Sequence, residues 1–179
     1  QRTIRARLMT KLDPKKVLSY FVKTSVRSHR KHRITKINRR WPYVHPGRAW
    51  ERRPKIAISI DQSGSVGDDL LEKFFGWLNE LSKFADFTVI PFDESVFEDK
   101  IYLWKMGDKR PRERVLCGGT NFDAPTNYVN GKDFDAHIIL TDMCAPKPGP
   151  SKAQRMWITD AQGKAHQNFA TGEQVLAVD

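Results

Sequence analysis

The chain has 179 residues, of which 39% are hydrophobic, and its mean hydropathy is −0.59. The length is sufficient for one domain with a sizeable core, and no run of about 18 apolar residues predicts a membrane-spanning helix. The formal net charge is +10, and the two cysteines are too few to crosslink such a domain, which favours a reducing, cytoplasmic location over a disulfide-rich secreted one.

The positive charge is concentrated at the start of the chain. Residues 1–55 hold 18 Lys and Arg against two acids, whereas the remaining residues carry a net charge of −6. This asymmetry predicts a basic arm over residues 1–54 and a mildly acidic body over residues 55–179. Because the first residue is Gln1 and not Met, we expect the sequence to be part of a longer protein.

A helix is predicted near the start of the basic arm. Asp13 suits the N-cap position and Pro14 the first helical position. One stripe of this helix contains Val17, Leu18, Phe21, Val22 and Ser25. The stripe predicts packing by one face. From Ser28 to Pro54 the helical pattern is lost, and prolines, a glycine and scattered aromatic residues predict an extended, basic connector.

The body alternates between strands and helices. The predicted strands are 55–60, 87–92, 95–104, 135–142, 155–159 and 172–178. The segment 95–104 partly alternates and suits an edge strand. A helix is predicted over residues 68–85 and a shorter one after Asp123. Apolar strands alternating with helices predict a Rossmann-like α/β fold with a mostly parallel central sheet, which binds ligands at the carboxyl ends of its strands.

Polar residues gather at those strand ends. Asp61 ends the first strand of the body, and Ser63 and Ser65 follow it on a turn. Asp142 ends the strand "HIILTD", and Thr120 lies on the glycine-flanked loop "CGGTNFD". Parallel strands place these three segments at one edge of the sheet, so we expect two carboxylates and three hydroxyls to converge there.

This donor set predicts a hard cation. Oxygen ligands without thiolate or imidazole favour Mg²⁺, Mn²⁺ or Ca²⁺ over zinc. Two carboxylates only just neutralise a divalent ion, so the bound ion would accept one more anionic oxygen, such as an Asp or Glu of a partner protein. The alternative is that the same residues are helix caps and loop residues without a metal.

The five residues Asp61, Ser63, Ser65, Thr120 and Asp142 resemble the metal-ion-dependent adhesion site of von Willebrand factor A (VWA) domains. More narrowly, the segments "IDQSGSV", "PFDESV", "CGGTNFD", "IILTD" and "MWITD" resemble the VWA-like domain that closes a bacterial and phage family of predicted metallopeptidases. The resemblance implies a VWA fold, a Mg²⁺-type ion held by the five residues, and a protein-binding role. It also implies a partner such as a MoxR-type AAA+ ATPase, or a peptidase half that precedes Gln1.

Two further acids lie near the same edge. Asp93 follows the second strand of the body, and Asp123 comes three residues after Thr120. Either carboxylate is a candidate to hydrogen-bond the metal ligands or their waters. The alternative is that both are solvated loop acids.

The sequence does not predict an enzyme for this region. It contains no H-E-x-x-H motif and no Gly-rich phosphate loop, and Ser63 and Ser65 have no evident partnered base. Two catalytic alternatives remain open: a regulatory domain of a metallopeptidase whose catalytic half lies upstream, and a metal-dependent hydrolase that uses the same acids.

The basic arm carries a second functional hypothesis, which is nucleic-acid binding with the VWA-like body as a scaffold. Dense Lys and Arg residues displace counterions from a phosphate backbone, and aromatic side chains stack on bases. The candidates are Arg30, Lys31, Arg33, Lys36, Arg39, Arg40 and Trp41, with Tyr43 and Trp50 as further aromatics. The alternative is that the arm lies against the acidic body or another part of the protein.

Overall fold

The computed structural model describes residues 14–25, 29–51, 54–82, 85–105 and 118–178. Within these ranges a six-stranded sheet has the order β5-β4-β3-β6-β7-β8. Its strands are β3 (Ile56–Asp61), β4 (Phe87–Phe92), β5 (Tyr102–Trp104), β6 (Ala136–Leu140), β7 (Gln154–Asp160) and β8 (Gln174–Val178). All neighbours are parallel except β4 and β5. The predicted α/β fold with a mostly parallel sheet is therefore confirmed.

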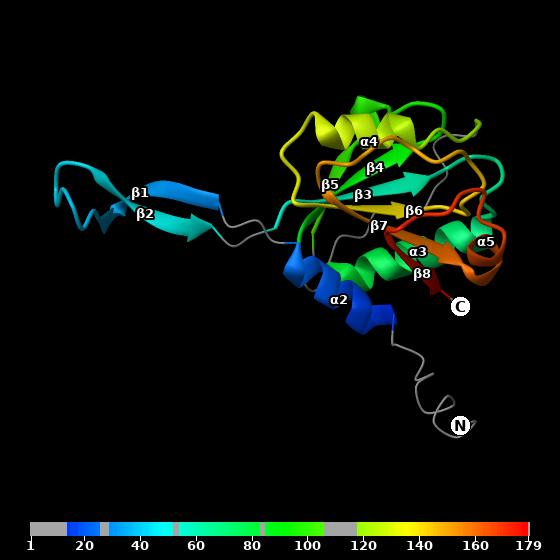
Figure 1. Cartoon of the computed structure of the whole chain (residues 1–179), viewed down its shortest axis with the longest axis horizontal. Coiled ribbons are helices and arrows are strands. Elements are labelled where there is room, and N and C mark those ends of the chain that lie inside the picture. The colour runs from blue at the N-terminus through cyan, green and yellow to red at the C-terminus, as the bar shows by residue number, and fades with distance from the viewer. Residues whose placement is uncertain (1–13, 26–28, 52–53, 83–84, 106–117, 179) are drawn as a thin grey trace, which may run out of the picture.

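Helices cover both faces of this sheet (Figure 1). The helices α2 (Pro14–Thr24) and α3 (Asp68–Leu81) lie on one face, and α4 (Asp123–Asn130) lies on the other. The short helix α5 (Ala161–Ala165) joins β7 to β8, and the 3-10 helix η1 (Glu98–Lys100) precedes β5. No helix among the described residues is long and apolar enough to cross a bilayer.

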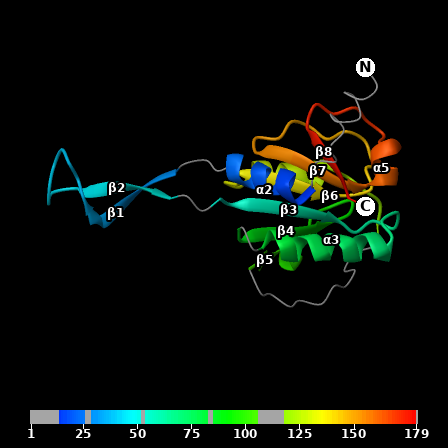
Figure 2. The same ribbon diagram turned by 90° about the horizontal axis from the view of Figure 1, so that it is seen from below.

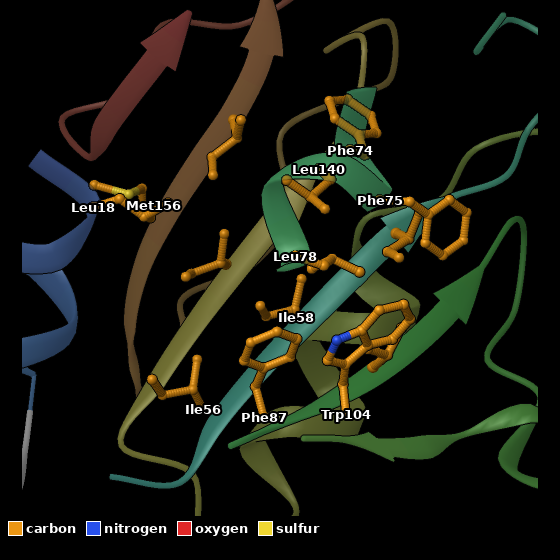
Figure 3. Packing of buried hydrophobic residues seen from close by; sticks show 14 of the residues in the cluster. Leu18, Ile56, Ile58, Phe74, Phe75, Leu78, Phe87, Trp104, Leu140 and Met156 are labelled. Carbon is orange, nitrogen blue, oxygen red and sulfur yellow. The ribbon is translucent and has the colours of Figure 1, made fainter. Parts of the chain in front are cut away.

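The central strand β3 is buried along its whole length, because it is paired on both edges and covered on both faces. Its residues Ile56 and Ile58 belong to one buried cluster with Phe74 and Leu78 of α3, and Ile58 lies beside Leu78 (Figure 3). Successive side chains of a strand alternate between faces, so an unbroken apolar run is what a doubly covered strand requires.

Two predicted elements are shorter than expected. In the predicted strand 95–104, the continuous pairing with β4 is limited to Tyr102–Trp104, and Val96 forms an isolated antiparallel bridge to Phe92; η1 lies between the two. The predicted helix 68–85 ends at Leu81. The hydroxyl of Ser82 donates to the backbone carbonyl of Asn79 at 2.8 Å, which satisfies one of the last carbonyls of the helix.

Helix α2 shares the core of the sheet, although it precedes the predicted boundary at residue 54. Leu18, Phe21 and Val22 are buried in the same cluster as β3 and α3, and Leu18 lies beside Met156 of β7 (Figure 3). The Ser25 hydroxyl donates to the carbonyl of Phe21 at 2.7 Å. The predicted apolar stripe is therefore confirmed, and it packs against the body.

The connector after α2 differs from the prediction. Its chain is extended, but it forms two paired antiparallel strands, β1 (His29–Ile37) and β2 (Pro46–Glu51), which we call the basic hairpin. The basic hairpin projects from the end of the body at which β3 begins (Figures 1 and 2). Neither face of it packs on the sheet, so its sequence lacks the apolar alternation by which strands are recognised.

Candidate metal centre

The strand order of the sheet reverses at one place, between β3 and β6. The chain leaves β3 for β4 on one side and later returns to β6 on the other side. Open α/β sheets bind ligands where the strand order reverses in this way, at the carboxyl ends of the strands. Asp61 is the last residue of β3, and Asp142 follows β6 by two residues. The two acids thus lie at the carboxyl ends of the two strands between which the order reverses.

The carboxylates of Asp61 and Asp142 are brought together by one hydroxyl. Thr141 Oγ1 lies 2.6 Å from Asp61 Oδ2 and 3.4 Å from Asp142 Oδ1, which places the two carboxylate oxygens within 6.0 Å of each other. Thr141 is fully buried, as is Asp61. In the described part of the chain no Lys or Arg forms an ion pair with either acid. No basic side chain in the described residues therefore competes with a cation for these two acids.

The turn after β3 places both serine hydroxyls beside this pair. The backbone N–H of Ser63 donates to Asp61 Oδ1 at 3.0 Å, which curls the turn over the carboxylate. The hydroxyls of Ser63 and Ser65 lie 3.1 Å apart. Ser63 is buried and Ser65 is exposed, so the turn extends from the interior to the surface.

The loop that carries Thr120 lies against this turn. The N–H of Gly64 donates to the carbonyl of Gly118 at 3.2 Å, and the N–H of Asn121 donates to the carbonyl of Asp93 at 3.0 Å. Thr120, half-buried, lies between these two anchor points. A Cβ on Gly118 would approach the carboxylate of Asp93 to 2.9 Å, so the loop needs glycine for this close packing.

These contacts join the three predicted segments at one edge of the sheet. We call Asp61, Ser63, Ser65, Thr120 and Asp142 the candidate metal centre. Among the described residues, no three His, Cys, Asp or Glu side chains gather in the way that would hold an ion by themselves. The candidate metal centre instead combines two carboxylates with three hydroxyls, a set that fits Mg²⁺ because this ion usually takes one or two carboxylates and keeps several waters.

The electrostatics of this edge are negative. Burial raises the pKa of Asp61, the hydroxyls of Thr141 and Ser63 act in the opposite direction, and the charge of Asp142 raises it further. Partial desolvation raises the pKa of the nearby Cys144 thiol, and the carboxylates of Asp142, Asp160 and Asp61 add to this effect. Several acids thus act on one small region without a compensating base.

The two acids predicted to support the ligands are held by backbone groups. Asp93 Oδ1 accepts the N–H of Ser95 at 3.1 Å, and its other oxygen faces Gly118. Asp123 Oδ1 accepts the N–H of Gly149 at 2.8 Å. Asp93 therefore supports the loop that carries Thr120, whereas Asp123 fastens the segment that leads to β7. A role for either in hydrogen-bonding ligands or waters stays a prediction.

Sequence reasoning missed two residues of this edge. Thr141 contacts both acids. Its position immediately before Asp142, at the end of an apolar strand, was the feature of the sequence that could have indicated this role. Asp160 ends β7, one strand farther along, and its Oδ1 accepts the N–H of Gly163 at 2.6 Å at the start of α5. Its position at a strand end matches that of Asp61 in β3.

The nucleic-acid candidates lie elsewhere. Arg33, Lys36, Arg39, Arg40 and Trp41 are exposed on the basic hairpin, at the opposite end of the body from the candidate metal centre (Figure 1). Arg30 and Lys31 belong to β1, but their side chains are outside the described part of the structure. The structure therefore separates the two sets of candidate residues.

A buried polar pair lies inside the sheet below the candidate metal centre. The imidazole Nε2 of His137 lies 2.8 Å from the hydroxyl of Ser59, and both residues are fully buried. Burial, and then the charge of Arg155, lower the pKa of His137 to about 3. His137 is therefore neutral in the folded protein at physiological pH.

The low pKa of His137 predicts that the fold loses stability in mild acid. Below pH 6.5 His137 is protonated in the unfolded chain but not in the folded chain, so the free energy of unfolding decreases as the pH is lowered from 6.5 to about 3. The expected loss at pH 5 is about 2 kcal/mol, measured by urea unfolding at pH 7.5 and pH 5. In His137→Gln this part of the pH dependence should disappear. An equal loss in both proteins would contradict the assignment.

The mostly parallel sheet covered by helices on both faces agrees with the fold of a VWA-like α/β domain. The family model described as VWA-like domain (DUF2201) matches residues 56–176, and the chain belongs to this family. Among solved structures, the chain is similar to an aerotolerance-related membrane protein from Bacteroides fragilis. The TM-score is 0.46 and the identity 17%, over 59% of this chain and 67% of that chain. No curated protein matches the chain.

Proposed function

We propose that the VWA-like domain is a metal-dependent protein-binding module. Asp61, Ser63, Ser65, Thr120 and Asp142 would hold a Mg²⁺-type ion directly or through water. The ion would leave one coordination position for a carboxylate of a partner protein. The single observation that supports this best is the pairing of Asp61 and Asp142 through Thr141, without a basic side chain beside them in the described chain.

The choice of ion follows from the donors. Carboxylate and hydroxyl oxygens favour Mg²⁺, with Mn²⁺ or Ca²⁺ as alternatives, because these hard ions prefer oxygen. Neutral hydroxyls add no negative charge, so an ion with two carboxylates keeps its affinity for a third anionic oxygen. An Asp or Glu of a partner supplies such an oxygen. The resemblance to VWA proteins makes a MoxR-type AAA+ ATPase, or a peptidase domain of the same protein, the partner that we would test first.

A binding role is favoured over hydrolysis. A hydrolase would need a base that reaches a substrate. The contact between Ser59 and His137 resembles a nucleophile with its base, but both residues are enclosed in the sheet. We therefore propose that this region binds and does not catalyse.

Titration calorimetry with Mg²⁺ and Mn²⁺ tests the metal. The wild-type chain should bind either ion, and Asp61→Asn should lower the affinity by more than about 100-fold, because loss of an outer hydrogen-bond partner alone costs about 10- to 100-fold. The matched control is Asp133→Asn, which removes an exposed carboxylate that contacts Lys55 at 3.5 Å. Equal heats from wild type and Asp61→Asn would refute the proposal.

Thr141 offers a finer variant of the same experiment. Thr141→Val keeps the buried shape and removes the hydroxyl that joins the two acids, so it should weaken Mg²⁺ binding by about 10- to 100-fold. Thr141→Ser keeps a hydroxyl and should bind close to wild type. If the Val and Ser variants bind alike, Thr141 does not position the carboxylates.

The open coordination position needs its own measurement. A glutamate-rich peptide should bind the wild-type chain in the presence of Mg²⁺ and dissociate when EDTA is added. A glutamine-rich peptide of the same length is the control, because it has no carboxylate to offer the ion. Mg²⁺ binding without any peptide binding that EDTA reverses would retain the metal and exclude the partner role.

A further inference from the structure

The basic hairpin, residues 29–51, carries charge that the rest of the described chain does not neutralise. Arg33, Lys36, Arg39, Arg40 and Arg48 are exposed, and the stretch 32–48 contains no Asp or Glu. None of these five side chains forms an ion pair within the described part of the chain. A surface that concentrates positive charge away from its own acidic body has the electrostatic character of a phosphate-binding surface.

The hairpin surface is also hollow. A concave region of about 890 Å³ is lined by Lys36, Arg39, Arg40, Arg48 and Trp41, together with both histidines of the stretch 32–48. Its lining includes no carboxylate. Cations on the walls and an indole between them are the combination by which proteins hold the backbone and the bases of a single strand.

The loop between β1 and β2 is built with a defined shape. Asn38 Oδ1 accepts the backbone N–H groups of Arg40 and Trp41 at 3.0 and 3.2 Å, which fixes the start of the loop. Gly47 lies so close to β1 that a Cβ would overlap the carbonyl of Lys36. These contacts are all made within the basic hairpin.

Two aromatic side chains project from this loop. Trp41 is 56% exposed and Tyr43 is 92% exposed. Tyr43 also has a φ of 63°, a left-handed conformation that is costly for an aromatic residue. Since Tyr43 is so exposed, burial within the described chain does not explain this conformation.

We propose that the basic hairpin binds single-stranded nucleic acid, with phosphates on the arginine and lysine side chains and bases stacked on Trp41 and Tyr43. A single strand is favoured over a duplex because its bases are free to stack on exposed rings, whereas paired bases present only their edges. The site is independent of the candidate metal centre, since it lies at the other end of the sheet (Figure 1).

Fluorescence anisotropy of the full chain with a labelled oligothymidylate of about 12 nucleotides tests the proposal. Binding with a Kd on the order of 10⁻⁵ M is expected at moderate salt. If the four Lys and Arg residues of the hollow each contact a phosphate, affinity should fall by about 50-fold between 50 and 200 mM salt. Binding should persist in EDTA, which separates it from the metal-dependent function.

Matched variants distinguish binding of the oligonucleotide by the basic hairpin from its attraction to positive charge elsewhere on the surface. Arg39→Gln combined with Arg40→Gln should weaken binding and flatten the salt dependence. Lys73→Gln combined with Lys100→Gln is the control, because it removes the same charge from exposed positions of the body. If both double variants weaken binding equally, the body attracts the oligonucleotide and the proposal is wrong.

Aromatic variants test the stacking. Trp41→Ala should lower affinity by about 5- to 150-fold, whereas Trp41→Phe should retain most of it. Tyr43→Ala should weaken binding more than Tyr20→Ala, which removes an exposed ring from α2. No change in Trp41→Ala, or tighter binding of a duplex than of the single strand, would overturn the proposal. No anisotropy change up to about 10⁻⁴ M protein would also overturn it and would leave a protein as the hairpin's ligand.

Discussion

Replacement of Arg155 by methionine should destabilise the fold by about 3 kcal/mol, because it removes several hydrogen bonds of a charged group and leaves buried partner groups unmatched. The arginine side chain is only 3% exposed, whereas that of Glu173 is 30% exposed, and the guanidinium donates to Glu173 from two nitrogens, each at 2.8 Å. A third nitrogen donates to the hydroxyl of Thr126 and the carbonyl of Gly149, both at 3.1 Å. It thereby joins β7 to α4 and to the segment before β8.

Lys55→Met is the matched control for Arg155→Met. Lys55 pairs with Asp133 at 3.5 Å, but both side chains are more than half exposed. Lys55→Met should therefore lower the free energy of unfolding by less than about 1 kcal/mol. Urea unfolding followed by circular dichroism measures both variants. If Arg155→Met costs no more than Lys55→Met, the network around Arg155 does not support the fold.

Replacement of Phe21 by alanine should also cost about 3–5 kcal/mol, since it removes a ring that is 1% exposed in the main core. The prediction matters for domain organisation, because Phe21 lies in α2, before the boundary at residue 54 that the charge distribution indicates. A large effect on the unfolding of the whole domain would show that α2 folds together with the sheet.

Tyr20→Ala provides the control within the same helix. Tyr20 precedes Phe21, but its side chain is 67% exposed, so its removal should change the free energy of unfolding by less than about 0.5 kcal/mol. Urea unfolding curves of the two variants give the comparison. Equal effects, or a separate early transition for α2, would indicate that the helix is an independent appendage.

The sequence was sufficient to predict most of the sheet, because its strands are buried on both faces. Strands such as Ile56–Asp61 and Ala136–Leu140 are short and mostly apolar, and their length and β-branched residues favour a covered parallel strand. The same logic located Asp61 and Asp142, since each comes where an apolar run stops. Their proximity follows from topology, and the hydrogen bonds to Thr141 supply the geometry that a pattern cannot.

The basic hairpin was missed for the opposite reason. Its strands cover no core, so Arg33 and Ile34 are both exposed and no period of two appears. The loop from Asn38 to His45 is longer than the two-residue turns by which hairpins are recognised in a sequence. The contact of Arg155 with Glu173 was also hidden, because 18 residues and the helix α5 separate the two in the chain.

The direction of β3 has a consequence for how this domain is arranged in a larger assembly. The basic hairpin precedes its first residue and the serine turn follows its last, and six residues of strand span about 20 Å. Ligands at the two poles would therefore not exclude one another sterically. With both proposed ligands bound, the domain would act as an adaptor that holds one macromolecule at each end of β3. The length of the strand would then determine the distance between them.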